Sequence, residues 1–291
     1  FLTAAVTPYH AVAVGSALLE KAGYVQLDDA STWASAIKPG GRYFYTRCDS
    51  TLVAFAVGGK YAAGGPFRMV GAHTDSPALK AKPLTKFGSG PTEGVLTQLS
   101  ISTYGGGLWH TWFDRDLGIG GLVILRKPDG SLEKRLVAIR EPVLRVPTLC
   151  IHLQSAAERD SFAPNKETHL VPVLCMAPGP ATATSKDKED EAAASADPFA
   201  SAQEPELWNL LAQRLGVEPG HIASHDLTLF DAQPPALTGA RSEFVCGGRL
   251  DNLASSFVAL EALADCSADA QLAESEAICC VALFDHEEVG A

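Results

Sequence analysis

The sequence has 291 residues, of which 46% are apolar and 20% are charged. This composition is that of an ordinary globular protein, and the length allows two domains. No run of about 18 or more apolar residues is present, so we expect no helix that spans a membrane. The net charge of −11 argues against a surface that binds nucleic acid, because such surfaces are usually basic.

The seven cysteines form no CxxC motif, and several lie in apolar runs, where a buried thiol is the usual interpretation. This pattern favours a reducing compartment, and we expect a cytoplasmic protein. The opening residues are apolar but lack the basic region of a secretory signal, so we interpret them as part of the fold. Because the first residue is Phe1 rather than Met, we expect the sequence to start inside a longer protein.

The first elements follow from apolar spacing. Apolar residues that recur every four positions predict a helix over 9–22. Residues 42–57 predict a pair of strands with a polar break at 48–51. Residues 67–72 predict a short strand that ends at His73.

The middle of the sequence has a different pattern. From residue 84 to about residue 174, short apolar segments alternate with glycine, proline and charge, which is typical of a β-rich domain. The strands that we expect there are 95–102, 122–125, 136–139, 149–153 and 170–174. Residues 178–206 have few large apolar groups to offset the entropy of ordering, so we expect a mobile loop, followed by a short helix at 206–215.

An α/β pattern returns near residue 230. Leu253 and Leu260 lie on one face of an expected helix, and the apolar run 278–284 is typical of a strand buried on both faces of a parallel sheet. The sequence therefore predicts an α/β fold whose catalytic domain has a mixed or parallel sheet and is interrupted by a β-rich domain. The catalytic domain comprises 1–83 and 230–291, and the inserted domain comprises 84–229.

Polar side chains follow the expected strand at 67–72. In an extended segment, positions i and i+2 point to the same side, so His73 can meet a metal ion while Asp75 lies close by. A carboxylate beside a ligating imidazole fixes its tautomer and raises its basicity. The alternative for this motif is a polar turn after a strand.

Carboxylates also stand at two later element ends. Asp251 precedes a helix, where it acts either as an N-cap or as a carboxylate that bridges two cations. Glu287 and Glu288 follow the run 278–284, and sites in open α/β sheets form at the carboxyl ends of strands. One glutamate can bind a cation while the other takes a proton from water, although charged residues often simply end a strand. Nitrogen and oxygen ligands without thiolate suit zinc, with manganese or cobalt as substitutes.

These residues lie in motifs that resemble the metal-site motifs of the aspartyl aminopeptidases, a family of dinuclear metallo-aminopeptidases. The motifs are His73-Thr74-Asp75-Ser76-Pro77, Arg249-Leu250-Asp251-Asn252 and Asp285-His286-Glu287-Glu288-Val289-Gly290. Segments at 105–109, 112–117, 151–154 and 169–172 are also similar to the family's sequence. The resemblance covers nearly the whole chain outside 178–206.

The resemblance implies a site that holds two divalent metal ions. It implies that His73 binds one ion, that Asp251 bridges both and that Glu288 is a further ligand. It also implies that Glu287 is the general base and that Asp75 orients His73. The family's remaining ligands, an Asp and a His, and its basic substrate-recognition residue would follow Ala291. The resemblance therefore leads us to expect that the sequence is part of a longer enzyme.

The resemblance also implies the assembly and the substrate. Family members form dimers through the inserted domain and assemble into tetrahedral dodecamers, and His152 would reach the neighbouring subunit's active site and touch the substrate. From the residues alone, His152 is only a polar residue in a strand-like run. The implied reaction is the hydrolysis of an N-terminal Asp or Glu from peptides in the cytosol. The alternatives are a dinuclear aminopeptidase of another specificity, or an assembly module that hydrolyses nothing.

Overall fold

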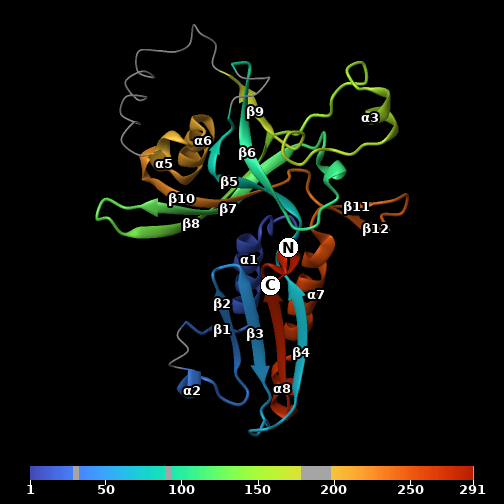
Figure 1. Cartoon of the computed structure of the whole chain (residues 1–291). Coiled ribbons are helices and arrows are strands. Elements are labelled where there is room, and N and C mark those ends of the chain that lie inside the picture. The colour runs from blue at the N-terminus through green and yellow to red at the C-terminus, as the bar shows by residue number, and fades with distance from the viewer. Residues whose placement is uncertain (29–32, 89–93, 178–197, 291) are drawn as a thin grey trace. The chain divides into compact units, whose positions relative to one another are not determined.

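The computed structural model describes residues 1–28, 33–88, 94–177 and 198–290 (Figure 1). The chain forms two compact units, of which the first comprises Phe1–Ser76 and Pro234–Ala291 and the second comprises Pro77–Gln233. The change of pattern in the sequence placed the two boundaries at 83/84 and 229/230. The second unit is longer at both ends because strands β5 (Ala78–Lys86) and β10 (Ile222–Asp231) belong to its sheet.

The first unit is built on a mixed sheet with the strand order β1-β2-β3-β13-β4. Its strands are β1 (Val25–Gln26), β2 (Arg42–Arg47), β3 (Thr51–Val57), β4 (Phe67–His73) and β13 (Ile278–Phe284). β13 lies between β3, to which it is antiparallel, and β4, to which it is parallel. The late strand β13 therefore joins two strands from the start of the chain.

Helices α1 (Pro8–Lys21) and α7 (Leu250–Cys266) cover one face of this sheet. α1 begins at the cap Thr7, whose side chain accepts the N–H of His10, and its boundaries confirm the helix expected at 9–22. Leu19 of α1 and Leu260 of α7 are fully buried in one core with Phe44 of β2. The core of the first unit therefore lies between these helices and the sheet.

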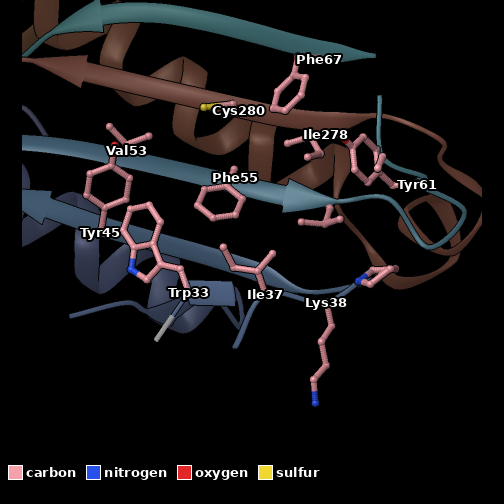
Figure 2. A pocket seen from close by; sticks show the side chains of 13 residues that line it. Trp33, Ile37, Lys38, Tyr45, Val53, Phe55, Tyr61, Phe67, Ile278 and Cys280 are labelled. Atoms are coloured by element: carbon pink, nitrogen blue, oxygen red, sulfur yellow. The ribbon is translucent and has the colours of Figure 1, made fainter. Parts of the chain in front are cut away.

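The other face of the sheet is partly open. A hollow of about 530 Å³ lies there, and aromatic and aliphatic side chains that include Trp33, Phe55 and Phe67 line it (Figure 2). The expectation that 278–284 is buried on both faces is wrong, because only Val281 and Leu283 of β13 are buried. Their side chains point to the helices, and the alternate residues of the strand face the hollow or solvent.

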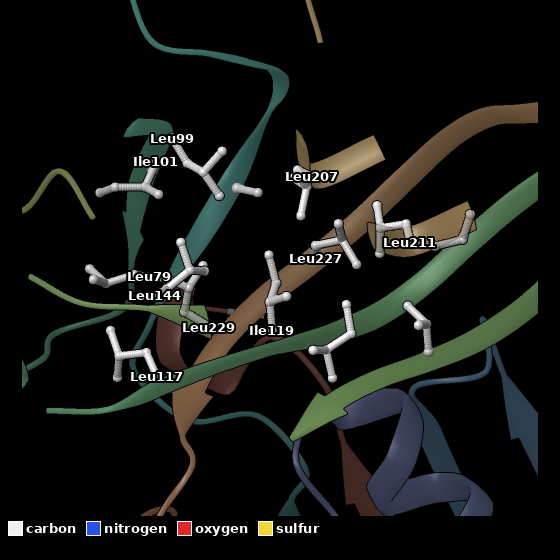
Figure 3. Packing of buried hydrophobic residues seen from close by; sticks show 14 of the residues in the cluster. Leu79, Leu99, Ile101, Leu117, Ile119, Leu144, Leu207, Leu211, Leu227 and Leu229 are labelled. Carbon is white, nitrogen blue, oxygen red and sulfur yellow. The ribbon is translucent and has the colours of Figure 1, made fainter. Parts of the chain in front are cut away.

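The second unit contains a six-stranded antiparallel sheet with the order β8-β7-β10-β5-β6-β9. Besides β5 and β10, its strands are β6 (Leu96–Tyr104), β7 (Leu117–Arg126), β8 (Leu132–Leu144) and β9 (Val173–Met176). Helix α6 (Pro205–Leu215) packs on this sheet through Leu207 and Leu211, which are fully buried (Figure 3). The helix confirms the prediction for 206–215.

Three predictions for this unit are wrong in part. Of the strand expected at 170–174, only residues 173 and 174 lie in a strand, β9. Residues 149–153 are a turn rather than a strand, because the side-chain amide of Gln154 donates to the carbonyl of Leu149 at 2.7 Å and folds the segment back. In the expected loop 178–206, residues 178–197 lie outside the described residues. The end of that segment is ordered, because the amide of Gln203 accepts from Thr85 at 2.8 Å and donates to the carbonyl of Pro83 at 2.9 Å.

Short elements complete the described chain. They are α2 (Trp33–Ala36), η2 (Trp109–Trp112), α3 (Ala156–Asp160), α5 (Pro198–Ser201), η4 (Pro219–His221), the hairpin of β11 (Ala236–Thr238) and β12 (Phe244–Cys246), α8 (Asp269–Glu274) and η5 (Glu287–Val289). None of the helices in the described ranges has the length and apolar character needed to cross a membrane.

Candidate metal centre

The parallel pairing of β4 and β13 brings the distant motifs together. His73, the last residue of β4, pairs with Phe284, the last residue of β13. Because parallel strands end at the same edge of a sheet, the residues after Phe284 meet His73 at that edge. The start of α7 lies at the same place, since the main-chain N–H of His73 donates to the side-chain oxygen of Asn252 at 3.2 Å.

Helix α7 fixes the backbone of His73 from two sides. In addition to the bond that the His73 N–H donates to Asn252, the hydroxyl of Ser256 donates to the carbonyl oxygen of His73 at 2.8 Å. Ser256 is fully buried on the same helix face as Leu253 and Leu260. Neither Asn252 nor Ser256 was predicted to act at the site. A serine on an apolar helix face was the available signal, because a buried hydroxyl needs a hydrogen-bond partner.

The imidazole of His73 is held between carboxylates and is 12% exposed. Its Nδ1 atom lies 3.1 Å from the carbonyl oxygen of Asp75 and 3.3 Å from the Oδ1 atom of that residue. Its Nε2 atom lies 3.3 Å from Oδ1 of Asp251 and 3.8 Å from Oε2 of Glu287. When Nδ1 carries the proton and donates to Asp75, Nε2 presents its lone pair to the other carboxylates.

Asp251 does not cap the helix. Its backbone is extended (φ −84°, ψ 112°), as at a helix start, but among the described residues its carboxylate accepts no hydrogen bond from a main-chain N–H of α7 and lies beside Nε2 of His73 instead. The capping alternative for Asp251 is therefore wrong. Its side chain is 83% exposed and extends towards Nε2 of His73, and its carbonyl oxygen accepts a hydrogen bond from Ser76 at 2.9 Å.

The two glutamates lie on the short helix η5, directly after β13. The N–H of Asp285 donates to the hydroxyl of Thr51 at 3.0 Å, and the N–H of Glu288 donates to Oδ2 of Asp75 at 3.1 Å. His286, which precedes Glu287, adopts a left-handed conformation with φ +71°. These bonds attach the turn to β3 and to the Asp75 carboxylate, so both glutamates are held next to His73.

The electrostatics of this edge favour a cation. Burial raises the pKa of Glu288, and the Asp75 carboxylate raises it further, against the lowering effect of His73. Within the described part of the chain, no lysine or arginine forms an ion pair with Asp251, Glu287 or Glu288. Several carboxylates gathered without a basic partner repel one another, and a bound divalent cation removes that repulsion.

The donor set fits a zinc ion. One ligand atom each from His73, Glu287 and Glu288 lies within 4.8 Å of the others, and the Oδ1 atom of Asp251 lies 3.3 Å from Nε2 of His73. An imidazole with carboxylates is a donor set found in catalytic zinc sites. Both glutamates reach the cluster, so the division of their roles into ligand and base stays a prediction.

Of the six residues predicted for the site, five come together in the first unit: His73, Asp75, Asp251, Glu287 and Glu288. His152 belongs to the second unit, where it lies exposed in the turn at 151–153. Its role at a substrate stays a prediction.

Comparisons with known proteins agree with a zinc peptidase. The family described as aminopeptidase I zinc metalloprotease (M18) matches residues 1–291. An aspartyl aminopeptidase from Aspergillus oryzae is 43% identical over the whole of this chain, which spans 60% of that protein. The structure of mApe1 from Chaetomium thermophilum is 34% identical, with a TM-score of 0.85 over 100% of this chain and 62% of that chain. The mApe1 dodecamer from S. cerevisiae is 28% identical, with a TM-score of 0.78 over 99% of this chain and 59% of that chain.

The chain thus spans about 60% of the length of the curated relative that it matches, and that match covers the whole of this chain. The sequence match, the fold and the cluster around His73 agree with one another. The chain therefore belongs to the aminopeptidase I zinc metalloprotease (M18) family.

Proposed function

We propose that the protein is a metal-dependent aminopeptidase that removes an N-terminal Asp or Glu from peptides. The observation that carries the proposal is the position of Nε2 of His73, which lies 3.3 Å from the carboxylate of Asp251 in a cluster with Glu287 and Glu288. Membership of a zinc metalloprotease family supports the metal, and a relative named aspartyl aminopeptidase supports the acidic substrate.

The metal chemistry rests on the carboxylates of the first unit. A zinc ion held there would polarise the scissile carbonyl and lower the pKa of a water molecule, so that hydroxide is available at neutral pH. We propose that the site holds two divalent ions, with manganese or cobalt as alternatives to zinc. His73 and Glu288 would each bind an ion, and Asp251 would bridge the two. The exposure of the Asp251 side chain, 83%, supports this role, because its second oxygen is open to a further ion.

Proton transfer falls to Glu287. Its side chain is 60% exposed, so its carboxylate is open to water while it lies 3.8 Å from Nε2 of His73. In the proposed reaction a carboxylate oxygen of Glu287 takes a proton from the attacking water, and the same carboxyl group later gives a proton to the leaving amine. Asp75 keeps the His73 ring in place during both steps.

The assembly is proposed on separate grounds. The second unit exposes large apolar side chains at Leu108, Ile151 and Leu153, which are 70%, 62% and 70% exposed. Such surfaces are typical of contacts between proteins. We propose that the second unit pairs two copies of the chain, with His152 contributed to the partner's substrate, and that the pairs form a dodecamer like that of S. cerevisiae mApe1. A cytoplasmic location is part of the same proposal.

The test combines metal content with hydrolysis. Purified protein is dialysed, its zinc is counted by mass spectrometry, and its rates are measured on peptides that begin with Asp, Glu or Leu. We expect retained zinc and faster cleavage of the acidic peptides. Glu287→Gln should abolish cleavage and leave the zinc bound, whereas Glu261→Gln, on the exposed face of α7, should change neither.

The other outcomes identify the alternatives. Faster cleavage of the Leu peptide would assign another specificity to the same metal centre. Retained zinc without any cleavage would indicate an assembly module. Protein that binds no zinc above background would overturn the metal centre itself.

A further inference from the structure

The hydroxyl of Ser76 reaches the main chain of Asp251. It donates to the carbonyl oxygen of Asp251 at 2.9 Å. Ser76 follows Asp75 in the segment after β4, and its side chain is half-buried. Pro77 comes next and disfavours helical angles at the residue before it, so the backbone of Ser76 has few conformations. The hydroxyl is therefore a short anchor with a restricted position.

The backbone of Asp251 suits this bond because it is extended. Its ψ angle is 112°, whereas a helical residue has a ψ of about −42°. The carbonyl group of Asp251 is therefore turned out of the direction that the carbonyls of a helix share. Its hydrogen-bond donor comes from the segment after β4 instead, as the hydroxyl of Ser76.

The residues on either side of Asp251 are held by other contacts. The guanidinium of Arg249 donates to two main-chain carbonyls near the start of the chain, at 3.3 and 3.4 Å. On the other side, Oδ1 of Asn252 accepts the main-chain N–H of His73 at 3.2 Å. These bonds fix the chain before and after Asp251, and the bond from Ser76 fixes the peptide group between them.

The position of the Asp251 carboxylate depends on this backbone. The side chain is 83% exposed, and its Oδ1 atom lies 3.3 Å from Nε2 of His73. So exposed a side chain gains little from packing, and the main chain from which it projects mainly sets its direction. The backbone of His73 is held separately, by Asn252 and by the hydroxyl of Ser256. Loss of the Ser76 hydroxyl would therefore displace Asp251 and leave His73 in place.

We propose that Ser76 is a positioning residue that holds the Asp251 carboxylate beside His73 and thereby sets the affinity for the second metal ion. The inference rests on the proposed function, in which Asp251 bridges two ions. A bridging carboxylate has to present both of its oxygens at once, so a small displacement affects it more than a ligand of one ion. Groups that orient the ligands from outside contribute strongly to metal affinity.

Metal titration tests this role without any substrate. Zinc is removed from the protein with a chelator, and the two zinc dissociation constants are then measured by calorimetry. Ser76→Ala should bind the first ion like the unchanged protein, because His73 keeps its position. It should bind the second ion about 10- to 100-fold more weakly, which is the usual effect of losing a group that orients a ligand.

Two variants of the same shape isolate the hydroxyl. Ser76→Thr keeps a hydroxyl at this position and should restore the affinity for the second ion. Ser76→Val has the shape of threonine without the hydroxyl, and it should bind the second ion as weakly as Ser76→Ala. If Ser76→Ala fails to fold, this pair decides the question, since β-branched side chains suit extended backbone.

A serine elsewhere in the first unit provides the control. The side chain of Ser275 is also half-buried, and its hydroxyl donates to the carbonyl oxygen of Ala277 at 3.4 Å. Ser275→Ala therefore removes a similar hydrogen bond away from the metal centre. Both zinc dissociation constants should stay the same in this variant.

The outcomes separate this inference from the proposed function. Two ions that bind to Ser76→Ala as tightly as to the unchanged protein would overturn the role of Ser76 and leave the metal centre intact. Equal weakening in Ser76→Thr and Ser76→Val would also overturn it, because the hydroxyl would then make no difference. An unchanged protein that binds fewer than two ions would overturn the two-ion centre, and this inference with it.

Discussion

The Asp75 carboxylate binds both sides of the metal centre, because Oδ2 accepts the main-chain N–H of Glu288 at 3.1 Å while Oδ1 lies 3.3 Å from Nδ1 of His73. The side chain is only 1% exposed. A single buried group thus sets the distance between the end of β4 and the turn after β13.

Asp75→Asn should weaken zinc binding without removing a ligand. The amide keeps the size of the carboxylate but loses its charge, so it orients His73 less firmly and lowers the basicity of the imidazole. We expect zinc affinity to fall about 10- to 100-fold, measured by competition with a chelator. Asp265→Asn, on the exposed side of α7, is the control and should bind zinc normally. If both variants bind zinc with the same affinity, Asp75 does not orient His73 for metal binding.

Ser256→Ala should loosen the backbone of His73. The variant leaves the His73 carbonyl oxygen without the hydroxyl that donates to it at 2.8 Å. We expect the free energy of unfolding to fall by about 1 kcal/mol, measured by denaturant titration. Ser255→Ala, one position along the same helix and exposed, should change it little. A larger decrease of the free energy of unfolding in Ser255→Ala than in Ser256→Ala would contradict the role of Ser256.

Acid should destabilise the second unit through His225. Burial lowers the pKa of this histidine below its ordinary value of 6.5, and its ring packs edge-on to Trp208 with the centroids 5.4 Å apart. Between this lowered pKa and 6.5, His225 is protonated in the unfolded chain but neutral in the folded chain. The free energy of unfolding therefore decreases as the pH falls through this range. Melting followed by tryptophan fluorescence should show this loss.

The matched variants for this effect are His225→Phe and His221→Phe. His225→Phe keeps an aromatic ring beside Trp208 and removes the titration, so its melting temperature should depend less on pH below 6.5. His221 is exposed in η4, and its replacement should leave the pH dependence unchanged. The same pH profile in both variants would argue against His225.

Among the described residues, β4 is the edge strand of its sheet, and this edge should promote association between copies of the chain. Met69 and Val70 of this edge strand are 74% and 53% exposed, and exposed apolar edge strands pair with other chains. Met69→Lys should therefore reduce aggregation, measured by light scattering at rising protein concentration. Leu237→Lys, at an equally exposed site of the β11–β12 hairpin, is the control. Equal improvement in both variants would indicate a general effect of charge.

The sequence predicted α1, the strands at 42–57, β4, α7 and β13 of the first unit from local signals, and also the convergence of the motifs at their ends, but it did not predict β1, α2, α8 or the β11–β12 hairpin. The strand at 67–72 ends at His73, the run 278–284 ends just before the glutamates, and parallel pairing brings the two ends together. The position of Ser256 on an apolar helix face could also be read from the sequence, but its role could not, because that depends on its hydrogen-bond partner. Its partner is a main-chain carbonyl, which no pattern of side chains indicates.

Other features depend on tertiary contacts that sequence patterns do not report. The apolar residues at 149–153 suggested a strand, but no strand of the described sheet pairs with them, and a local amide bond to Leu149 makes them a turn. The extent of the inserted unit was also underestimated, because β5 and β10 have apolar residues that suit either sheet. Their pairing with each other, with Thr228 opposite Lys80, and with β6 and β7 assigns both strands to the second unit.

That pairing has a consequence for how the chain acquires its structure. β3 and β4 are synthesised early, but the strand that joins them, β13, follows only after the whole of Pro77–Gln233. Because β5 and β10 run antiparallel as neighbours, folding of the inserted unit draws residues 76 and 234 towards each other. Once the inserted unit has folded, bringing β13 to β4 closes only a short loop instead of one of more than about 150 residues, and the entropy cost is lower. Folding of the inserted unit before the sheet of the first unit is therefore the favoured order.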